Sequence, residues 1–442
     1  MKVKILSRNP DTYLRETKRD IHKLPRNYDP ILHPFQAARE YTQALNAVKL
    51  ERVFAKPFVK SLDGHKDSIN CMCKHPSELS ALVSGSYDGE VRIWNLTTGA
   101  CERTILAHDG ITRGIIYVPN GEQLITIGDD KTIKTWNAVT ASENEEPINT
   151  IVSKTMLTGI THHQFNPIFV TCGEVCHMWE ETRNEPVRTF KWGVDSLYDV
   201  KFNPVQSNLL ASCASDRSII LYDTRDTGPL KRIIMKLRSN KLSWNPMEAV
   251  TFTCANEDYN LYTYDIRKLK TPVNVHVDHV GAVIDVDYAP TGKEFVSGSY
   301  DKSIRIFEVN KGHSREVYHT KRMQRLTCIA WSFDNKYIIS GSDEMNLRVW
   351  KAKASEKLGI LRPRERNARL YNEALKQKFA ANKEIRRIAR HRQVPKHIYN
   401  ARNELRSIRE KALRKEANRR YHSKKGAVPY VAERQKHVVS QE

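Results

Sequence analysis

The segment VSGSYDKSIRIFE, residues Val296–Glu308, decides the fold of this chain. It contains Ser297 and Asp301, and His279 lies eighteen residues before Ser297. Serine, histidine and aspartate together can form a hydrolase triad. The same pattern, however, returns as VSGSYDGEVRIWN, which ends at Asn95, and as ISGSDEMNLRVWK, which ends at Lys351. A catalytic site is needed once, whereas a turn is needed in every repeat, so the recurrence favours a structural role.

A large aromatic residue closes each repeat, and weaker copies read ITIGDDKTIKTWN, ASCASDRSIILYD and TCANEDYNLYTYD. Successive closing aromatics are 42 or 43 residues apart. A period of about 40–45 residues is typical of WD-type propellers, in which each repeat supplies one four-stranded blade. We therefore predict an all-β, seven-bladed WD40 β-propeller over residues 57–352. The closing aromatics are Trp94, Trp136, Trp179, Tyr222, Tyr264, Phe307 and Trp350.

The ends of the repeat region predict how the ring closes. A strand-like stretch around Phe58–Leu62 precedes the first repeat, and no further strand-like run follows Trp350. We expect the early strand to complete the last blade, because closure removes the exposed edges of an open sheet. The third repeat has Gly173 where other repeats have a turn aspartate, so we expect that blade to be the loosest or the most adapted to a partner.

The polar residues at fixed positions fit a structural role. In WD repeats, which this region resembles, His, Ser or Thr, Asp and Trp side chains form a hydrogen-bonded chain inside each blade and satisfy buried polar groups. A hydrolase would instead need a nucleophile open to substrate and oxyanion donors, and we predict no catalytic residue. The expected structural tetrads include His65, Ser84, Asp88 and Trp94 in the first repeat, and His279, Ser297 and Asp301 in the sixth.

Composition bounds the remaining possibilities. The chain has 442 residues, no run of 18 apolar residues and a start too short in apolar residues for a secretory signal. The eight cysteines are therefore expected to be reduced core residues of an intracellular protein. Cys172, Cys176 and His177 fall in CGEVCHMW, but the two thiols occupy expected core positions rather than a zinc turn. We predict neither a metal nor a cofactor.

Charge divides the chain into three domains. Residues 1–56 contain 12 Lys or Arg and 6 Asp or Glu, residues 57–352 contain 34 and 36, and residues 353–442 contain 26 and 9. The net charges are therefore +6, −2 and +17, which add to the total of +21. A nearly neutral propeller is thus followed by a strongly basic C-terminal domain, which indicates a polyanion or an acidic partner.

The N-terminal arm has two parts. PRNYDPILHPF contains three prolines and predicts an extended chain, and AAREYTQALNAVKLERVF has apolar residues at the three- and four-residue spacing of a helix. The arm is equally compatible with a solvated segment and with a peptide that docks on another protein.

The C-terminal domain predicts two basic helices. The first runs from Arg364 to about Arg392, and Pro395 ends it; the second begins near Ile398. Each has a narrow apolar stripe and a wide cationic face. The candidate RNA- or partner-binding residues are Arg386, Arg387, Arg390, Arg392, Arg402, Arg406, Arg409, Lys411, Arg414, Lys415, Arg419 and Arg420.

Three uses of these helices differ in how well they fit the sequence. A membrane surface is disfavoured because the apolar stripes contain no Trp and much Ala, and a purely solvated face would mix the two signs of charge. Nucleic acid together with a protein groove fits best, because arginine binds phosphate bidentately and stacks on bases. Interleaved aromatic rings favour RNA with unpaired bases over duplex DNA; they are Tyr371, His391, Tyr399, Tyr421 and His422. RKEANRRYHSKK also fits a nuclear import signal.

The flanking segments carry a family resemblance. DPxxHPFxxAREY and LNAxKLERVFAKPF before the propeller, and ASEKLG, RIARHR, VPKHIY and HSKKGAVPYV after it, resemble the Sof-like ribosome-biogenesis factors, which in metazoa are also called DDB- and cullin-associated factor thirteen. The resemblance implies a non-enzymatic component of the nucleolar small-subunit processome. Its implied partners are small-subunit pre-rRNA, the guide snoRNP and other processome proteins.

The second family name implies a different role, that of a substrate receptor of a cullin-4 RING ubiquitin ligase. Such receptors often carry an aromatic-Asp-x-Arg sequence at a strand end. Two successive repeats have it, with Asp223 and Arg225 after Tyr222 and with Asp265 and Arg267 after Tyr264. Tyr stands where Trp is usual, and each Asp and Arg could equally form only a local ion pair. Both functions therefore remain hypotheses at this point.

Overall fold

The computed structural model describes residues 29–139, 146–191, 193, 195–226 and 228–441. The chain divides into two compact units. One contains residues up to 57 together with 353–391, and the other contains 58–352 together with 392 onward. The basic C-terminal domain expected from the sequence thus contributes to both units, which are described separately below.

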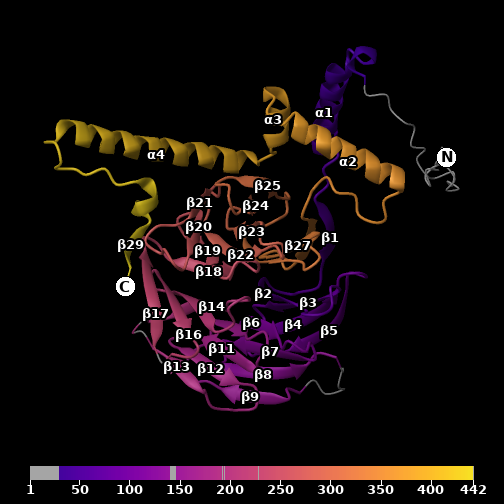
Figure 1. Cartoon of the computed structure of the whole chain (residues 1–442). Coiled ribbons are helices and arrows are strands. Elements are labelled where there is room, and N and C mark those ends of the chain that lie inside the picture. The colour runs from indigo at the N-terminus through magenta and orange to yellow at the C-terminus, as the bar shows by residue number, and fades with distance from the viewer. Residues whose placement is uncertain (1–28, 140–145, 192, 194, 227, 442) are drawn as a thin grey trace, which may run out of the picture. The chain divides into compact units, whose positions relative to one another are not determined.

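The described strands of the larger unit form seven antiparallel sheets, which are the blades of a propeller (Figure 1). Blades one to three contain β2 (Ile69–Lys74), β3 (Ala81–Ser86), β4 (Glu90–Asn95), β5 (Ala100–Leu106), β6 (Thr112–Tyr117), β7 (Gln123–Gly128), β8 (Thr132–Asn137), β9 (Asn149–Val152), β10 (Gly159–His162), β11 (Ile168–Cys172), β12 (Cys176–Glu180) and β13 (Arg188–Phe190). Blades four and five contain β14 (Leu197–Phe202), β15 (Leu209–Ala214), β16 (Ser218–Asp223), β17 (Pro229–Met235), β18 (Ser239–Trp244), β19 (Thr251–Asn256), β20 (Asn260–Asp265) and β21 (Asn274–Val277). Blades six and seven contain β22 (Val283–Tyr288), β23 (Glu294–Ser299), β24 (Ile304–Glu308), β25 (Ser314–Tyr318), β26 (Leu326–Trp331), β27 (Tyr337–Ser342), β28 (Leu347–Lys351) and β1 (Phe58–Leu62).

The ring closes as the sequence predicts. Strand β1 pairs antiparallel with β28, so that Phe58 lies opposite Trp350 and Leu62 opposite Leu347. The innermost strands of blades one and seven, β2 and β26, also pack against each other. Blade seven is therefore built from both ends of the repeat region, and the seven-bladed WD40 fold is confirmed.

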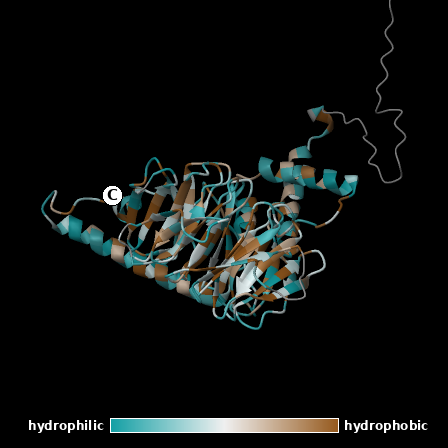
Figure 2. Ribbon diagram, turned by 90° about the horizontal axis from the view of Figure 1, so that it is seen from below, coloured by the Kyte–Doolittle hydropathy of each residue, from teal (hydrophilic) through white to brown (hydrophobic). Residues whose placement is uncertain are grey.

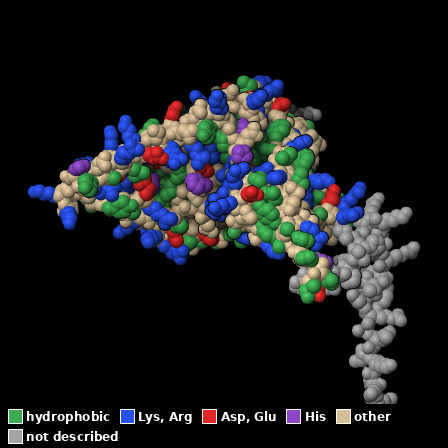
Figure 3. Space-filling model, turned by 90° about the horizontal axis from the view of Figure 1, so that it is seen from above, with side chains coloured by type: hydrophobic (Ala, Val, Ile, Leu, Met, Phe, Trp, Pro, Cys, Tyr) green, Lys and Arg blue, Asp and Glu red, His purple; other side chains and the backbone are tan. Residues whose placement is uncertain are grey.

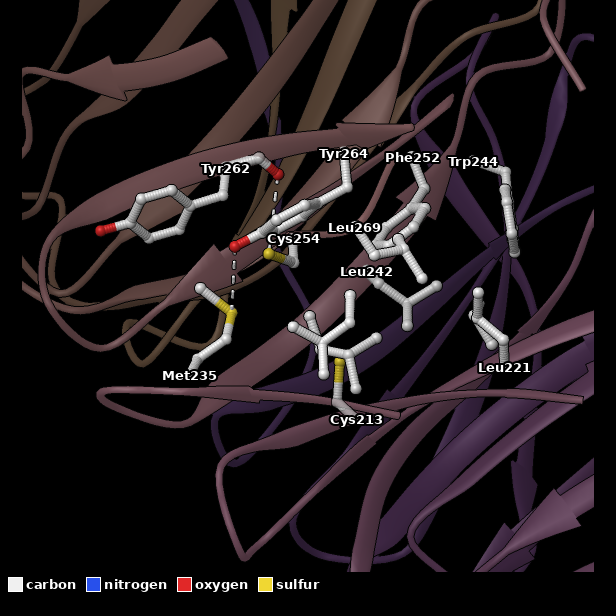
Figure 4. Packing of buried hydrophobic residues seen from close by; sticks show 13 residues of the cluster. Cys213, Leu221, Met235, Leu242, Trp244, Phe252, Cys254, Tyr262, Tyr264 and Leu269 are labelled. Carbon is white, nitrogen blue, oxygen red and sulfur yellow. Dashed lines mark hydrogen bonds between the residues drawn. The ribbon is translucent and has the colours of Figure 1, made fainter. Parts of the chain in front are cut away.

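Apolar side chains fill the space between neighbouring blades. Figure 4 shows the cluster between blades four and five, in which Leu221, Leu242 and Phe252 are at most 2% exposed. The closing aromatic Tyr264 lies within this cluster, and its hydroxyl donates to the Met235 sulfur at 3.8 Å. All seven closing aromatics are buried, because each stands at the position where one blade packs on the next. Figure 2 shows the corresponding contrast between largely apolar strands and mostly polar helices.

Blade three keeps its four strands although it has the shortest ones, with 4, 5, 5 and 3 residues. Gly173 stands at its turn, where a Cβ atom would lie 2.2 Å from the Met156 carbonyl oxygen. The turn is thus too close to the neighbouring loop for a side chain, which accounts for the missing aspartate. Trp179 still donates from its ring nitrogen to the Thr171 hydroxyl at 2.8 Å.

The smaller unit is helical. It contains the 3₁₀ helix η2 (Pro30–Leu32), α1 (Gln36–Val53), α2 (Pro363–Lys378) and α3 (Lys383–Arg390). Ala44 and Val48 of α1 form a buried cluster with Leu375 and Ile385. Tyr41 donates to Glu384 at 2.6 Å, and Lys376 pairs with Glu51 at 2.8 Å. The helix predicted at residues 37–54 is therefore present, and it docks on the first helices of the chain's own tail, an arrangement that the sequence did not indicate.

Three sequence predictions need correction. The helix expected from Arg364 to about Arg392 is two helices: α2 ends at Lys378, and Asn382 caps the start of α3 by accepting from the Glu384 amide. The segment expected to be extended lies partly outside the described residues, and its described part forms η2, where Asp29 accepts from the Ile31 amide. A strand does follow Trp350: β29 (Val438–Gln441) pairs with β17 of blade four. Four residues are too few to give a clear alternation in sequence.

The second predicted basic helix is α4 (Lys396–His422), followed by the 3₁₀ helix η3 (Glu433–Lys436) and β29. Among the residues with described structure, no helix is both long and apolar enough to span a membrane.

Candidate nucleic-acid interface

Helix α4 is tied to the propeller at its N-terminal end. Arg392 donates from Nε to the backbone carbonyl of Arg315 in β25, at 2.6 Å. Ile398 in the first turn is 1% exposed. One turn later, the Arg402 guanidinium lies 3.1 Å from the buried carboxylate of Asp278. These contacts hold the start of the helix against blades five and six.

The segment after α4 returns to the propeller. Lys436 lies 2.9 Å from Glu416 of the helix, and the Arg420 guanidinium lies 4.9 Å from the Tyr430 ring. His437 Nδ1 is 2.9 Å from the Tyr262 hydroxyl of blade five. Strand β29 then extends blade four to five strands, with Ile234 opposite Ser440. Helix α4 is thus anchored beyond both of its ends.

Between the two anchors lies the α4 midsection, defined as residues 406–415. Its five cations are exposed, and in the described part of the chain only one of them has a carboxylate partner, namely Arg406 with Glu410 at 2.8 Å. Ile408 and Leu413 are 63% and 51% exposed. The midsection therefore presents a dense, largely uncompensated positive charge on a rigid support. The five cations are Arg406, Arg409, Lys411, Arg414 and Lys415.

The other predicted cations have different surroundings. Arg386, Arg387 and Arg390 are exposed on α3, in the smaller unit, and Arg419 is exposed near the end of α4. Three are engaged within the chain: Arg392 with a backbone carbonyl, Arg402 with Asp278 and Arg420 with Glu416 at 3.1 Å. The sequence pattern could not separate these anchors from the exposed residues, because helical spacing alone does not say which face is covered.

Aromatic rings lie beside the exposed charge. Tyr399 and Tyr421 of α4 are 58% and 84% exposed. Figure 3 shows Lys and Arg side chains spread widely over the face seen from above, with fewer Asp and Glu among them. Exposed rings next to guanidinium groups can stack unpaired bases, whereas the cations bind phosphate.

The sixth blade contains Ser297, His279 and Asp301, the three residue types of a hydrolase triad. His279 lies 2.7 Å from the Ser297 hydroxyl through Nε2 and 2.9 Å from Asp301 through Nδ1. All three side chains are buried. Burial lowers the pKa of His279. Burial alone would raise the pKa of Asp301, but His279 and Arg305 hold it well below its usual range. The arrangement cross-links the blade and offers no access to a substrate.

The first blade forms the expected series of hydrogen bonds through His65, Ser84, Asp88 and Trp94 only in part. His65 Nε2 lies 2.6 Å from Ser84, and Trp94 donates to the same hydroxyl at 2.8 Å. Asp88 does not reach His65; it accepts from Ser86 and from the Glu90 amide, and His65 Nδ1 has no partner among the described residues. The residue after Asp88 is Gly89, with φ of 84°, whereas the equivalent positive-φ turn positions of other blades are held by larger residues such as Lys131 and Lys302.

The cysteines considered as metal ligands lie in the core. Cys172 and Cys176 are fully buried and face each other across β11 and β12. Burial raises the pKa of the Cys172 thiol to about 12 and also raises that of Cys176. Both are thus held as neutral thiols. All eight cysteines are free, and no group of three or more His, Cys, Asp or Glu that could hold a metal occurs within the described ranges.

The two aromatic-Asp-x-Arg sequences form exposed ion pairs at strand ends. Arg225 lies 3.0 Å from Asp223, and Arg267 lies 2.8 Å from Asp265. The arginine side chains are 72% and 73% exposed. Each arginine also donates its backbone amide to the same aspartate, at 2.9 Å. The two sites are therefore alike in geometry and lie in neighbouring blades, with the guanidinium groups open to a partner.

Comparison with known proteins accounts for both parts of the chain. A model described as "WD domain, G-beta repeat" matches residues 56–95, 99–137, 184–223, 270–308 and 311–351, and one described as "Sof1-like domain" matches residues 352–438. A "DDB1- and CUL4-associated factor 13" from Danio rerio is 61% identical over 441 residues, covering 99% of both chains. The chain belongs to the Sof1-like family of WD-repeat proteins.

Relatives of this family span large evolutionary distances. The Homo sapiens "DDB1- and CUL4-associated factor 13" is 59% identical over 442 residues and covers 100% of this chain and 99% of its own. "Protein SOF1" of Saccharomyces cerevisiae is 42% identical over 465 residues, covering 99% and 94%. Neither matched model describes a catalytic domain. The repeats that end at Trp179 and Tyr264 lie outside the WD matches, and both lack the GH dipeptide.

Proposed function

We propose that this protein is a non-enzymatic assembly factor of the small-subunit processome that binds small-subunit pre-rRNA or its guide snoRNP. The observation that carries the proposal is the α4 midsection, whose five exposed cations are held on a helix anchored beyond both ends. The resemblance to Sof-like factors names the particle, and the midsection supplies a way to bind its RNA. The same proposal places the protein in the nucleolus.

The physical basis is phosphate binding. Arginine and lysine that neutralise phosphates release condensed counterions, which gives tight, salt-sensitive and largely sequence-independent affinity. The exposed Ile408 and Leu413 add an apolar stripe that a protein groove can cover. The propeller has a net charge of −2 over residues 57–352. Taken as a whole, it is therefore better suited to bind neighbouring processome proteins than to bind a polyanion.

The test is UV crosslinking of the full-length protein in cells, followed by sequencing of the attached RNA. We expect many more crosslinks on small-subunit pre-rRNA or the guide snoRNA than on a region of the same length in an abundant unrelated RNA. A crosslink profile that follows only cellular RNA abundance would contradict the proposal.

The alternative is a substrate receptor of a cullin-4 RING ubiquitin ligase. The printed name of several relatives associates those proteins with DDB1 and CUL4. In this chain the specific observation is the pair of matched, exposed ion pairs of Arg225 and Arg267. A partner that contacts both blades could bind both guanidinium groups at once. The two functions do not exclude each other, because the midsection and these strand ends are separate surfaces.

Changing both Arg225 and Arg267 to Ala tests this alternative. We expect adaptor affinity to fall about tenfold, because exposed arginines at an interface are frequent hot spots. Propeller stability should change by less than about 1 kcal/mol, since exposed ion pairs contribute little. Affinity is measured by titration with purified adaptor. Arg183→Ala is the control, because Arg183 forms an exposed pair with Glu180 at 2.8 Å. Equal affinity of the double variant and the control would remove the structural basis for this role.

A further inference from the structure

A second basic surface lies on the propeller itself, where blades six and seven meet. It consists of the turn after β23, with Tyr300 and Lys302, and of the loop before β26, with Lys321, Arg322 and Arg325. We call these five residues the blade-six patch. Lys302 donates to Gln324 at 2.8 Å, and the Arg325 guanidinium lies 5.5 Å from the centre of the Tyr300 ring. The turn and the loop therefore form one continuous surface.

The patch carries positive charge without compensation. Its four cations are exposed. Within residues 300–302 and 319–325, the acidic residue is Asp301, which is buried and bound to His279. In the described part of the chain, no carboxylate lies within ion-pair distance of the four cations, although the exposed Asp343 follows β27 nearby and donates its amide to the Arg325 carbonyl. Several other exposed arginines of the propeller, such as Arg225 and Arg183, are paired.

The patch also offers an aromatic surface. Tyr300 is 46% exposed although Arg325 lies against its ring. A ring with a guanidinium on one side and solvent on the other can stack an unpaired base, and the guanidinium itself can do the same. A purely acidic peptide would use the charge but would leave the ring without a partner. The combination thus favours a nucleic-acid strand with unpaired bases.

The patch is continuous with the beginning of α4. The loop with Lys321 and Arg322 directly follows β25, where Arg392 binds the Arg315 carbonyl. Burial, together with the charge of His397 in α4, lowers the pKa of His319 in the same loop. The patch and the start of α4 thus belong to the same compact unit.

We propose that the blade-six patch is a second RNA-binding surface, which takes a single-stranded RNA segment by phosphate contacts to Lys321, Arg322 and Arg325 and by stacking of one base on Tyr300. This inference rests on the proposed function, since it assigns the propeller a direct part in holding the same RNA. It gives the nearly neutral propeller a local RNA site that its overall charge does not reveal.

The test uses the full-length chain and a single-stranded RNA of about 20 nucleotides labelled at one end. Lys321, Arg322 and Arg325 are changed together to Gln in one variant, and Tyr300→Leu is a second variant. We expect the triple variant to bind about tenfold more weakly and to reduce the slope of log affinity against log salt by about 2, from three lost phosphate contacts. Tyr300→Leu should weaken binding about five- to tenfold with an unchanged slope.

The matched control changes Lys268, Lys270 and Lys293 to Gln. These lysines are exposed and lie in loops at the opposite ends of the strands of blades five and six, so the net charge falls equally while the patch stays intact. The control should bind within about twofold of the unchanged protein. Equal RNA affinities of the triple variant and this control would overturn the proposal that the patch binds RNA. If RNA affinity still depended on the α4 midsection in that case, the proposed function would be unaffected.

Two further outcomes are decisive. A triple variant that binds RNA weakly together with a Tyr300→Leu variant of full affinity would overturn stacking on Tyr300 and leave phosphate contacts as the way in which the patch binds RNA. Failure of the unchanged protein to bind RNA would contradict the proposed function itself. A direct readout is the site of UV attachment on thiouridine-substituted RNA: attachment within residues 294–302 or 319–326 supports the patch, and attachment confined to α4 overturns it.

Discussion

Changing the five cations of the α4 midsection to glutamine is expected to lower the affinity for single-stranded RNA about 10²- to 10³-fold near physiological salt. Each single-strand phosphate contact contributes about 0.7 to the slope of log affinity against log salt, so five lost contacts reduce that slope by about 3.5. Glutamine has nearly the same helix propensity as arginine and lysine, and the two anchors of α4 remain. The change therefore removes charge while keeping the helix. The measurement is a titration with labelled RNA at several salt concentrations.

The control for this prediction is an equal loss of charge on the propeller. Five exposed lysines are changed to glutamine, and none of them has a carboxylate partner in the described part of the chain: Lys154, Lys268, Lys270, Lys293 and Lys336. We expect this variant to bind within about threefold of the unchanged protein. A similar loss in both variants would mean that RNA responds only to net charge. Full affinity of the midsection variant would show that α4 is not the RNA-binding element.

The midsection and the blade-six patch differ in where their tyrosines lie relative to the cations, so substitutions in them should change RNA affinity in different ways. In α4 the exposed Tyr399 and Tyr421 flank the charged stretch, whereas in the patch Tyr300 lies among the cations. Charge removal in α4 should therefore act mainly through the salt-dependent part of binding, and Tyr300→Leu mainly through the part that salt leaves unchanged. This separation allows the two surfaces to be assigned independently with one titration series.

The repeat region was predictable because the same physical requirement recurs in every blade. A closing aromatic such as Trp94 or Trp350 must be buried where one blade packs on the next, and the turn that precedes its strand must be tight. Seven copies of a weak signal fix the period and the closure by β1. Departures in a single blade could not be predicted. Asp88 accepts from Ser86 and from the Glu90 amide instead of binding His65, and this choice of partners depends on the local backbone geometry.

The tail was predictable in composition but not in its contacts. Helical spacing identified α4, yet the partners that cover part of it are far away in the sequence, as in the pair of Arg402 with Asp278. The same holds for α1, where Tyr41 meets Glu384. The charges and the apolar stripes of such helices suit several partners about equally. The sequence therefore narrows the set of possible partners but does not identify which partner covers a given helix face. The blade-six patch was missed because its charge is diluted in a propeller that is neutral as a whole.

Asp278→Ala is expected to destabilise the propeller strongly. The Asp278 side chain is 3% exposed, and it accepts from the Ser314 amide and hydroxyl, each at 2.8 Å. Its other neighbours are Arg402 at 3.1 Å, His313 at 3.2 Å and the buried Arg305 at 3.8 Å. Removing the carboxylate leaves the Arg305 guanidinium buried with only Asp301 to oppose its charge, and two of its nitrogens already lack a partner in the described part of the chain. We expect a loss of about 3–5 kcal/mol.

The comparison with Arg402→Ala separates the two roles of Asp278. Arg402 is 52% exposed, so its removal should cost the propeller less than about 1 kcal/mol while freeing the start of α4. Urea unfolding followed by tryptophan fluorescence measures the propeller, and amide hydrogen exchange in residues 396–405 measures the anchoring of the helix. Asp278→Ala should change both readouts and Arg402→Ala only the second. Equal effects of the two substitutions on unfolding would show that Asp278 acts through the helix and that Arg305 is adequately satisfied without it.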